Sequence, residues 1–160
     1  MSERLLNYLV AQGIITREIA DRLHNEHIEN GKSVRELLSG LKAAGKRLCI
    51  ATSKPDAAAK LVMHHFGLDE WVPEIIGGTD DDRRNSKGKV IAWAIREYGL
   101  DPGKVIMVGD REHDVHGATE NGIPAIGITW GYGDRPELDG AGAKVTLDTP
   151  DEVLDYILKG

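Results

Sequence analysis

The 160-residue sequence contains one cysteine, few aromatic residues and no long apolar run. Cys49 is alone, so no disulfide forms within the chain, which fits a reducing compartment. No apolar segment approaches the roughly 20 residues needed to span a bilayer, and the start lacks signal-peptide features. We expect a cytoplasmic protein with no membrane partner. Cys49, between Leu48 and Ile50, is expected to be a buried strand thiol.

The chain also has fewer basic than acidic residues. The chain has 20 Lys and Arg against 26 Asp and Glu, for a net charge of −6. Binding to a phosphate backbone or an anionic membrane depends on clustered Lys and Arg, which this balance does not favour. We therefore expect no nucleic-acid partner, and any anionic ligand must be held by a local group of residues.

Strand and helix patterns alternate from residue 33 onward. Apolar runs predict strands at 47–51, 74–76, 104–108, 124–129 and 144–147. Amphipathic helices are predicted before the first run, after each of the first three runs and at the C-terminus, with Pro55 opening the helix after the first run and Gly45, Gly67 and Gly99 marking helix ends. The alternation predicts an α/β fold, a Rossmann-like three-layer parallel sheet of about five strands over residues 33–160.

Residues 1–32 have a different pattern. Leu5, Leu6, Leu9 and Val10 form one helical stripe, Gly13 breaks it, and Thr16 is placed to cap a second helix. This segment is predicted to be a helical hairpin that precedes the α/β core.

Polar residues follow the apolar runs where ligands bind in open parallel sheets, beyond the carboxyl ends of the strands. They are Thr52, Ser53 and Lys54 after the first run, Ser86 and Lys87 at a later helix start, and Asp110 and Asp114 after run 104–108. The two aspartates either present oxygens to Mg²⁺, or Asp110 or Glu112 caps the next helix. Thr52 and Lys87 suit a phosphoryl group, although a lone lysine at a helix start is usually solvated.

Three stretches, 50–55, 86–87 and 108–115, resemble motifs two, three and four of the haloacid dehalogenase (HAD) superfamily, in its phosphoglycolate-phosphatase-like branch. The resemblance implies binding of phosphate or a small phosphomonoester, and hydrolysis of the ester by a nucleophilic aspartate with Mg²⁺. It assigns the phosphoryl oxygen to Thr52, charge neutralisation to Lys87, and Mg²⁺ to Asp110 and Asp114. Ser53 and Lys54 would border the substrate pocket.

The family's first motif, an apolar strand ending in Asp-x-Asp-Gly-Thr, has no counterpart in this sequence. Asp80-Asp-Asp82 lies in a polar loop without a preceding strand end of that kind. We therefore expect a truncated or recombined HAD-like core that is catalytically impaired or inactive and binds Mg²⁺ with reduced affinity. The alternatives are an active Mg²⁺-dependent phosphatase with an unorthodox nucleophile, or an interaction or structural module.

In the family this first strand lies in mid-sheet, between the strands that correspond to 104–108 and 47–51. Its loss would leave two buried edges with unpaired backbone groups. The sheet then closes by direct pairing of these two strands, by a strand from a partner, or by an extended part of residues 1–32. Exposed edges also favour a homo-oligomer. The hairpin itself loosely resembles the N-terminal domain of type IV pilus and type II secretion assembly ATPases, or a remnant of the family's helical cap.

Overall fold

The computed structural model describes residues 34–65 and 67–159. The helical hairpin predicted for residues 1–32, its two resemblances and the domain boundary at residue 33 fall outside this range and stay predictions. In the described part of the chain, no helix is both long and apolar enough to cross a membrane.

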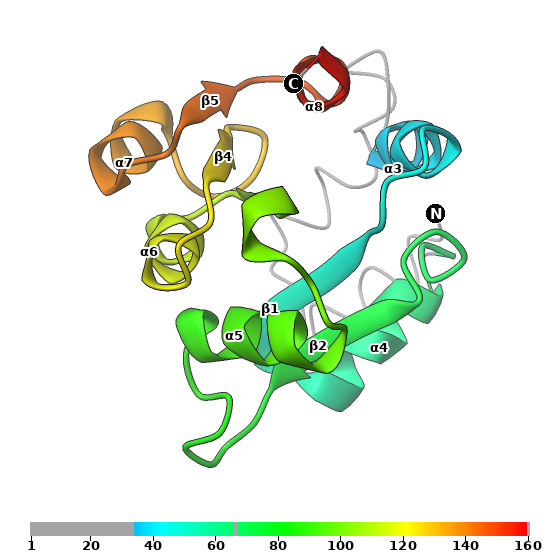
Figure 1. The fold of residues 1–160 in the computed structure, drawn as a ribbon, viewed down its shortest axis with the longest axis vertical. Helices are drawn as coiled ribbons and strands as arrows, with labels where there is room; N and C mark the ends of the chain where they lie inside the picture. Colours follow the sequence, from blue (N-terminus) through cyan, green and yellow to red (C-terminus); the bar gives the residue numbers. More distant parts are fainter. Residues whose placement is uncertain (1–33, 66, 160) are drawn as a thin grey trace.

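The first half of the described chain builds a two-stranded parallel sheet. Its elements are α3 (Val34–Ala43), β1 (Cys49–Pro55), α4 (Asp56–His65), β2 (Glu74–Gly78) and α5 (Lys87–Glu97). In the register of β1 and β2, Cys49 lies opposite Glu74 and Ala51 opposite Ile76. Figure 1 shows α5 in front of this sheet and α4 behind it.

The second half builds a three-stranded parallel sheet in the order β3, β4, β5. Its elements are a 3₁₀ turn η1 (Pro102–Lys104), β3 (Met107–Gly109), α6 (Glu112–Glu120), β4 (Ala125–Ile128), α7 (Arg135–Ala141), β5 (Val145–Leu147) and α8 (Pro150–Lys159). Leu37 and Leu41 of α3 and Val153 of α8 pack with Ile126 on one face of β4. Val115 and Leu138, from α6 and α7, pack with Ala125 on the other.

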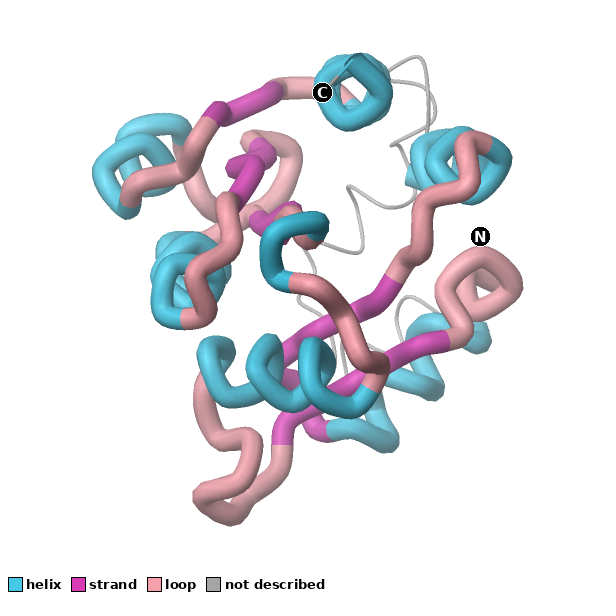
Figure 2. The backbone as a smooth tube through the Cα atoms, viewed as in Figure 1, coloured by secondary structure: helices cyan, strands magenta, loops and turns pink. Residues whose placement is uncertain are grey.

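The described strands thus form two sheets, which Figure 2 shows as two separate groups. The predicted α/β fold with about five parallel strands is confirmed. Of the three predicted ways to close the sheet, direct pairing of β1 with β3 is wrong, because β1 pairs only with β2 and β3 only with β4 within the described residues. The two sheets nevertheless adjoin, since Ala51 of β1 and Met107 of β3 pack against one apolar cluster.

The strands differ in burial in an unusual order. In β2, every residue from Ile75 to Gly78 is buried, whereas Cys49, Ile50, Ala51 and Thr52 of β1 are all only half-buried. In the other sheet, β4 is buried from Ala125 to Gly127, and Met107 and Val108 of β3 are half-buried. β1 and β3, at the junction of the two sheets, are therefore less buried than β2 and β4, the strands with which they pair.

Most predicted boundaries agree with the structure. Gly45, Gly67 and Gly99 all adopt positive φ at the ends of helices or their last turns, which only glycine tolerates easily. The opening of α4 was wrong, because Pro55 ends β1 and the helix begins at Asp56. The run 104–108 is a strand only from Met107, since Pro102 and Gly103 begin a 3₁₀ turn.

Candidate functional site

The carboxyl-terminal half of β1 carries the first group of predicted site residues. The strand continues to Pro55, so Thr52, Ser53 and Lys54 lie within it and not in a following loop. The Lys54 N–H donates to the Thr52 hydroxyl at 3.2 Å, which leaves the Thr52 O–H available to donate elsewhere. Ser53 is exposed. Burial lowers the pKa of the half-buried Lys54 ammonium.

Lys87 connects the two sheets. It is the first residue of α5, whose N-cap Ser86 accepts a hydrogen bond from Lys89 N–H. The Lys87 Nζ donates to the Ala51 carbonyl at 3.2 Å and forms an ion pair with Asp114 Oδ1 at 2.8 Å. The two side chains are only 11% and 6% exposed. The ammonium is therefore fixed between the middle of β1 and the first turn of α6.

Asp114 holds the turn between β3 and α6. Its Oδ2 accepts hydrogen bonds from the backbone N–H groups of Asp110 at 3.0 Å and Arg111 at 3.1 Å. A side chain at Gly109 would collide with the Asp114 carboxylate, so glycine is required for this close approach. Both Asp114 oxygens are thus engaged, one by Lys87 and the other by the turn.

Asp110 is enclosed by the loop that follows β4. Its Oδ2 accepts a hydrogen bond from Tyr132 N–H at 2.9 Å, and its backbone carbonyl accepts one from Gly133 N–H at 2.9 Å. A Cβ atom at Gly131 would collide with the Asp110 side chain, and one at Gly133 with the Asp110 carbonyl. The carboxylate is therefore held by backbone groups from a segment more than 20 residues away.

Helix α7 supports the same turn and was missing from the predicted elements. Its Glu137 Oε2 accepts hydrogen bonds from Arg111 Nε at 3.0 Å and from Glu112 N–H at 3.2 Å. The bond to Glu137 raises the pKa of the Arg111 guanidinium. The signal for this helix was present in Asp134-Arg-Pro-Glu137, since Asp134 caps the helix by accepting from Glu137 N–H at 2.9 Å.

The described residues do not by themselves complete a magnesium site. Asp114 has both oxygens occupied by protein donors, which leaves Asp110 as the carboxylate with remaining acceptor capacity. Across residues 34–65 and 67–159, no group of three or more His, Cys, Asp or Glu side chains is placed to hold a metal ion. Mg²⁺ is bound through one or two carboxylates together with water and phosphate oxygens, and Asp110 is the predicted ligand that has an oxygen to offer it.

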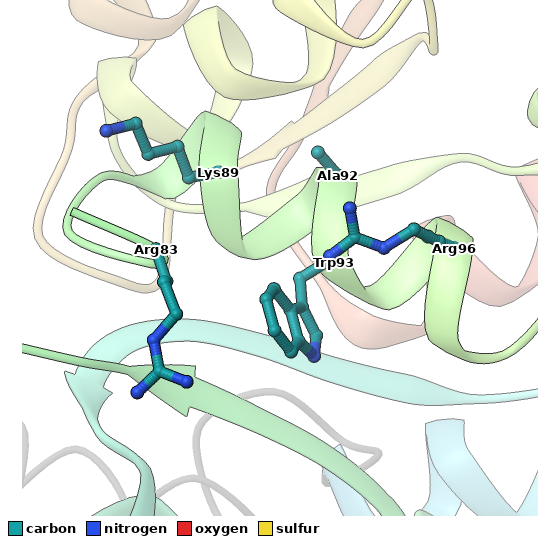
Figure 3. Close-up of a pocket in the computed structure, with 5 residues that line it drawn as sticks. All are labelled: Arg83, Lys89, Ala92, Trp93 and Arg96. Atoms are coloured by element: carbon teal, nitrogen blue, oxygen red, sulfur yellow. The ribbon is translucent and has the colours of Figure 1, made fainter. Parts of the chain in front are cut away.

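A surface hollow of about 290 Å³ lies elsewhere, on the outer side of α5. It is lined by Arg83, Lys89, Ala92, Trp93 and Arg96, none of which was a predicted site residue (Figure 3). The Arg84 and Arg96 guanidinium groups lie over the Trp93 ring, at 4.8 and 4.7 Å from its centroid. These cation–π contacts account for the clustering of charge around the tryptophan.

Comparison with known proteins gives consistent matches. The haloacid dehalogenase-like hydrolase family matches residues 6–128. The tyrosine-protein kinase PtkA of Mycobacterium tuberculosis is 41% identical over 103 residues, which cover 64% of this chain and 35% of that protein. The phosphoglycolate phosphatase of Vibrio vulnificus is 25% identical over 126 residues, covering 79% of this chain and 55% of that enzyme. A predicted phosphatase from Clostridium acetobutylicum superposes with a TM-score of 0.77 at 32% identity, covering 98% of this chain and 77% of that one.

The chain spans about a third to about half of the length of these curated relatives. The family match begins at residue 6, inside the segment predicted to be a hairpin. The relatives confirm the predicted resemblance to the phosphoglycolate-phosphatase-like branch. Sequence, fold and relatives agree that the chain belongs to the haloacid dehalogenase-like hydrolase family.

Proposed function

We propose that this chain is the phosphate-binding core of a HAD-type phosphomonoester hydrolase, without a nucleophile in residues 1–160 and therefore catalytically impaired. The observation that carries the proposal is the position of Lys87. One ammonium group reaches both the Ala51 carbonyl and the Asp114 carboxylate. All three predicted motifs thereby meet at one place, as a phosphate site requires.

A phosphoryl group would be held between β1 and α5. The Thr52 hydroxyl would donate to one of its oxygens, and the Lys87 ammonium would share its charge between Asp114 and the phosphoryl group. Because Lys87 is mostly removed from solvent, its charge acts more strongly on an anion than a surface lysine would. Ser53 and Lys54 would border the pocket on its open side, where Ser53 is exposed.

Asp110 and Asp114 would have different roles. Asp110 would offer a carboxylate oxygen to Mg²⁺, with an affinity reduced by the small number of ligands. Asp114 would act chiefly as a positioning residue, because it binds Lys87 and the backbone of the turn. Both carboxylates belong to the β3–α6 turn, so the negative charge of the site would lie there.

Turnover would be low because no aspartate follows an apolar run where the family has its nucleophile. Groups that only position and neutralise the substrate recover a small part of the rate that a covalent step supplies. The chain as given would therefore bind phosphate better than it hydrolyses phosphate esters.

The proposal is tested by titrating the full chain with inorganic phosphate in a calorimeter and by following p-nitrophenyl phosphate with Mg²⁺. We expect phosphate binding that Lys87→Met abolishes and Lys89→Met retains, since Lys89 is exposed and its Nζ donates to the Asp82 carbonyl. Turnover of p-nitrophenyl phosphate by the unsubstituted chain should not exceed turnover by the Asp110→Asn variant. Turnover that Asp110→Asn abolishes would instead establish an active phosphatase with an unorthodox nucleophile. Absence of phosphate binding would favour an interaction or structural module.

A further inference from the structure

A group of positively charged side chains lies on the outer face of α5, in the hollow that Figure 3 shows. Lys89, Trp93 and Arg96 are spaced at i, i+4 and i+7, so they lie on one stripe of the helix. Arg83, from the loop before α5, also lines the hollow, and Arg84 lies over the Trp93 ring. We call these five residues, Arg83, Arg84, Lys89, Trp93 and Arg96, the basic patch.

Two of the four cations have nearby partners, and only one of these partners is a carboxylate. Arg83 Nε pairs with Asp81 Oδ2 at 2.7 Å. Lys89 Nζ donates to a neutral group, the Asp82 carbonyl, at 2.9 Å. The charge of Lys89 is therefore held in place without being neutralised.

Trp93 fixes the other two cations. The Arg84 and Arg96 guanidinium groups lie over its ring, and within residues 34–65 and 67–159 neither forms an ion pair with a carboxylate. Arginine can stack on an aromatic face and still present its N–H fork to a carboxylate. Arg84 is also half-buried, with its Nε enclosed. Side chains held in this way lose less conformational freedom when they bind an anion.

The composition and shape of the basic patch indicate a protein partner. Tryptophan and arginine are enriched at protein interfaces, where they carry much of the binding free energy. The hollow of about 290 Å³ has the volume of roughly ten water molecules, which is more than one oxyanion fills. It is also shallow, since Arg83, Lys89, Ala92 and Arg96 are exposed, whereas a small-molecule site covers most of its ligand. A short segment of polypeptide suits such a surface.

The charge of the patch determines that this segment is acidic. Adjacent carboxylates would accept hydrogen bonds from Arg96 and Lys89, with the charge of Arg84 beside them. A nucleic acid has the same sign of charge, but it would extend beyond the patch over a chain whose net charge is −6. A short acidic segment confines its charge to the patch.

We infer that the basic patch on α5 binds a short acidic segment of a partner protein. The inference does not rest on the proposed function, because none of the five residues belongs to the proposed phosphate site. Binding of the segment is measured without phosphate, so the two proposals fail independently.

The test uses the full chain and a fluorescein-labelled peptide, Gly-Asp-Glu-Asp-Glu-Gly, whose binding is followed by fluorescence anisotropy. The amide counterpart, Gly-Asn-Gln-Asn-Gln-Gly, carries the same label without the side-chain carboxylates. A labelled thymidine oligonucleotide with four phosphodiester groups matches the charge of the acidic peptide. Arg96→Gln and Lys89→Gln each remove one charge from the patch. Lys46→Gln is the matched control, because Lys46 is exposed and lies before β1, outside the basic patch.

We expect saturable binding of the acidic peptide that weakens about tenfold in Arg96→Gln and about threefold in Lys89→Gln. Binding should stay within about twofold in Lys46→Gln, because exposed charges separated by more than a Debye length are screened. The amide peptide should bind at least about tenfold more weakly than the acidic one. All three substituted side chains are exposed, so the fold should be retained.

Absence of binding, equal binding of the amide peptide, or an equal loss in Arg96→Gln and Lys46→Gln would overturn the inference. Tighter binding of the oligonucleotide than of the acidic peptide would also overturn it, because the patch would then be a nucleic-acid site. A dimer of the chain that Arg96→Gln dissociates would assign the patch to a second copy of this chain, which likewise contradicts the inference.

Discussion

The strands of each sheet differ in burial. β1 and β2 pair in parallel, yet β2 is buried from Ile75 to Gly78, whereas β1, which carries Thr52, Ser53 and Lys54, is at most half-buried. The same difference separates β4 from β3. β5, at the other edge of the three-stranded sheet, is half-buried at Val145 and Leu147, whereas β4 pairs on both sides and is buried. The comparison teaches that coverage of a strand in this sheet depends on its edge partners as much as on the helices above and below it.

The largest effect is expected from truncating β4, the middle strand of the three-stranded sheet. Ile126→Ala in β4 removes a fully buried side chain and should lower the free energy of unfolding by about 4 kcal/mol. Ile50→Ala, the same substitution in half-buried β1, should cost about 1 kcal/mol. Urea unfolding of the two variants measures this difference directly. Equal losses would show that β1 is as well covered as β4.

The next largest effect on stability is expected at Lys87, whose ammonium group lies between the two sheets. Lys87→Met leaves the buried Asp114 carboxylate without its ion-pair partner and should destabilise the fold by about 3 kcal/mol. Lys89→Met, two residues along the same helix, should change stability by less than about 0.5 kcal/mol because Lys89 is exposed. Thermal unfolding of both variants at equal salt compares them. Similar melting temperatures would mean that Lys87 is solvated.

A smaller effect is expected at the loop over Asp110. Gly131→Ala places a methyl group against the Asp110 carboxylate and should cost about 1–2 kcal/mol, with weaker binding of inorganic phosphate. Gly140→Ala is the matched control, since nothing lies within 4 Å of its new Cβ and alanine favours helix α7. Calorimetric titration of both variants with phosphate separates the two. Unchanged binding in Gly131→Ala would show that the loop does not position Asp110.

The least disruptive measurement uses the thiol of Cys49 in β1. Burial raises the pKa of this thiol from 9.0 to about 11, so its thiolate at pH 8 should be about a hundredfold scarcer than that of an ordinary cysteine. Labelling with a disulfide reagent should therefore be slow in the native chain and fast in urea. Rapid native labelling would show that β1 opens readily, and would sharpen the contrast with the buried β2.

Much of the fold was predictable because local signals and tertiary structure agree. Gly45, Gly67 and Gly99 mark helix ends in the sequence pattern and adopt positive φ at helix ends in the structure. Helix α7 was missed because a seven-residue helix has too few turns to show a clear apolar period. The polar residues of β1 were expected in a loop, since strand patterns are read from apolar residues.

The site was predictable as a set of residues but not as a set of contacts. Lys87, Asp110 and Asp114 were selected from their places after strands. Nothing in their spacing indicated that Asp114 would use both oxygens within the protein, or that Glu137 would hold the N-terminal turn of α6. Such contacts join residues distant in the chain, so only the packing of α5, α6 and α7 brings them together.

The sequence alone determined the family and the order of the described strands and helices except α7, because these are written in local patterns and motifs. Only the tertiary structure decided that the described strands form two sheets and that β1 and β3 do not pair with each other. It also decided that one lysine links the two halves. The physical reason is that pairing and burial depend on which distant segments meet. The residues of a strand do not by themselves indicate which strand will pair with its edge.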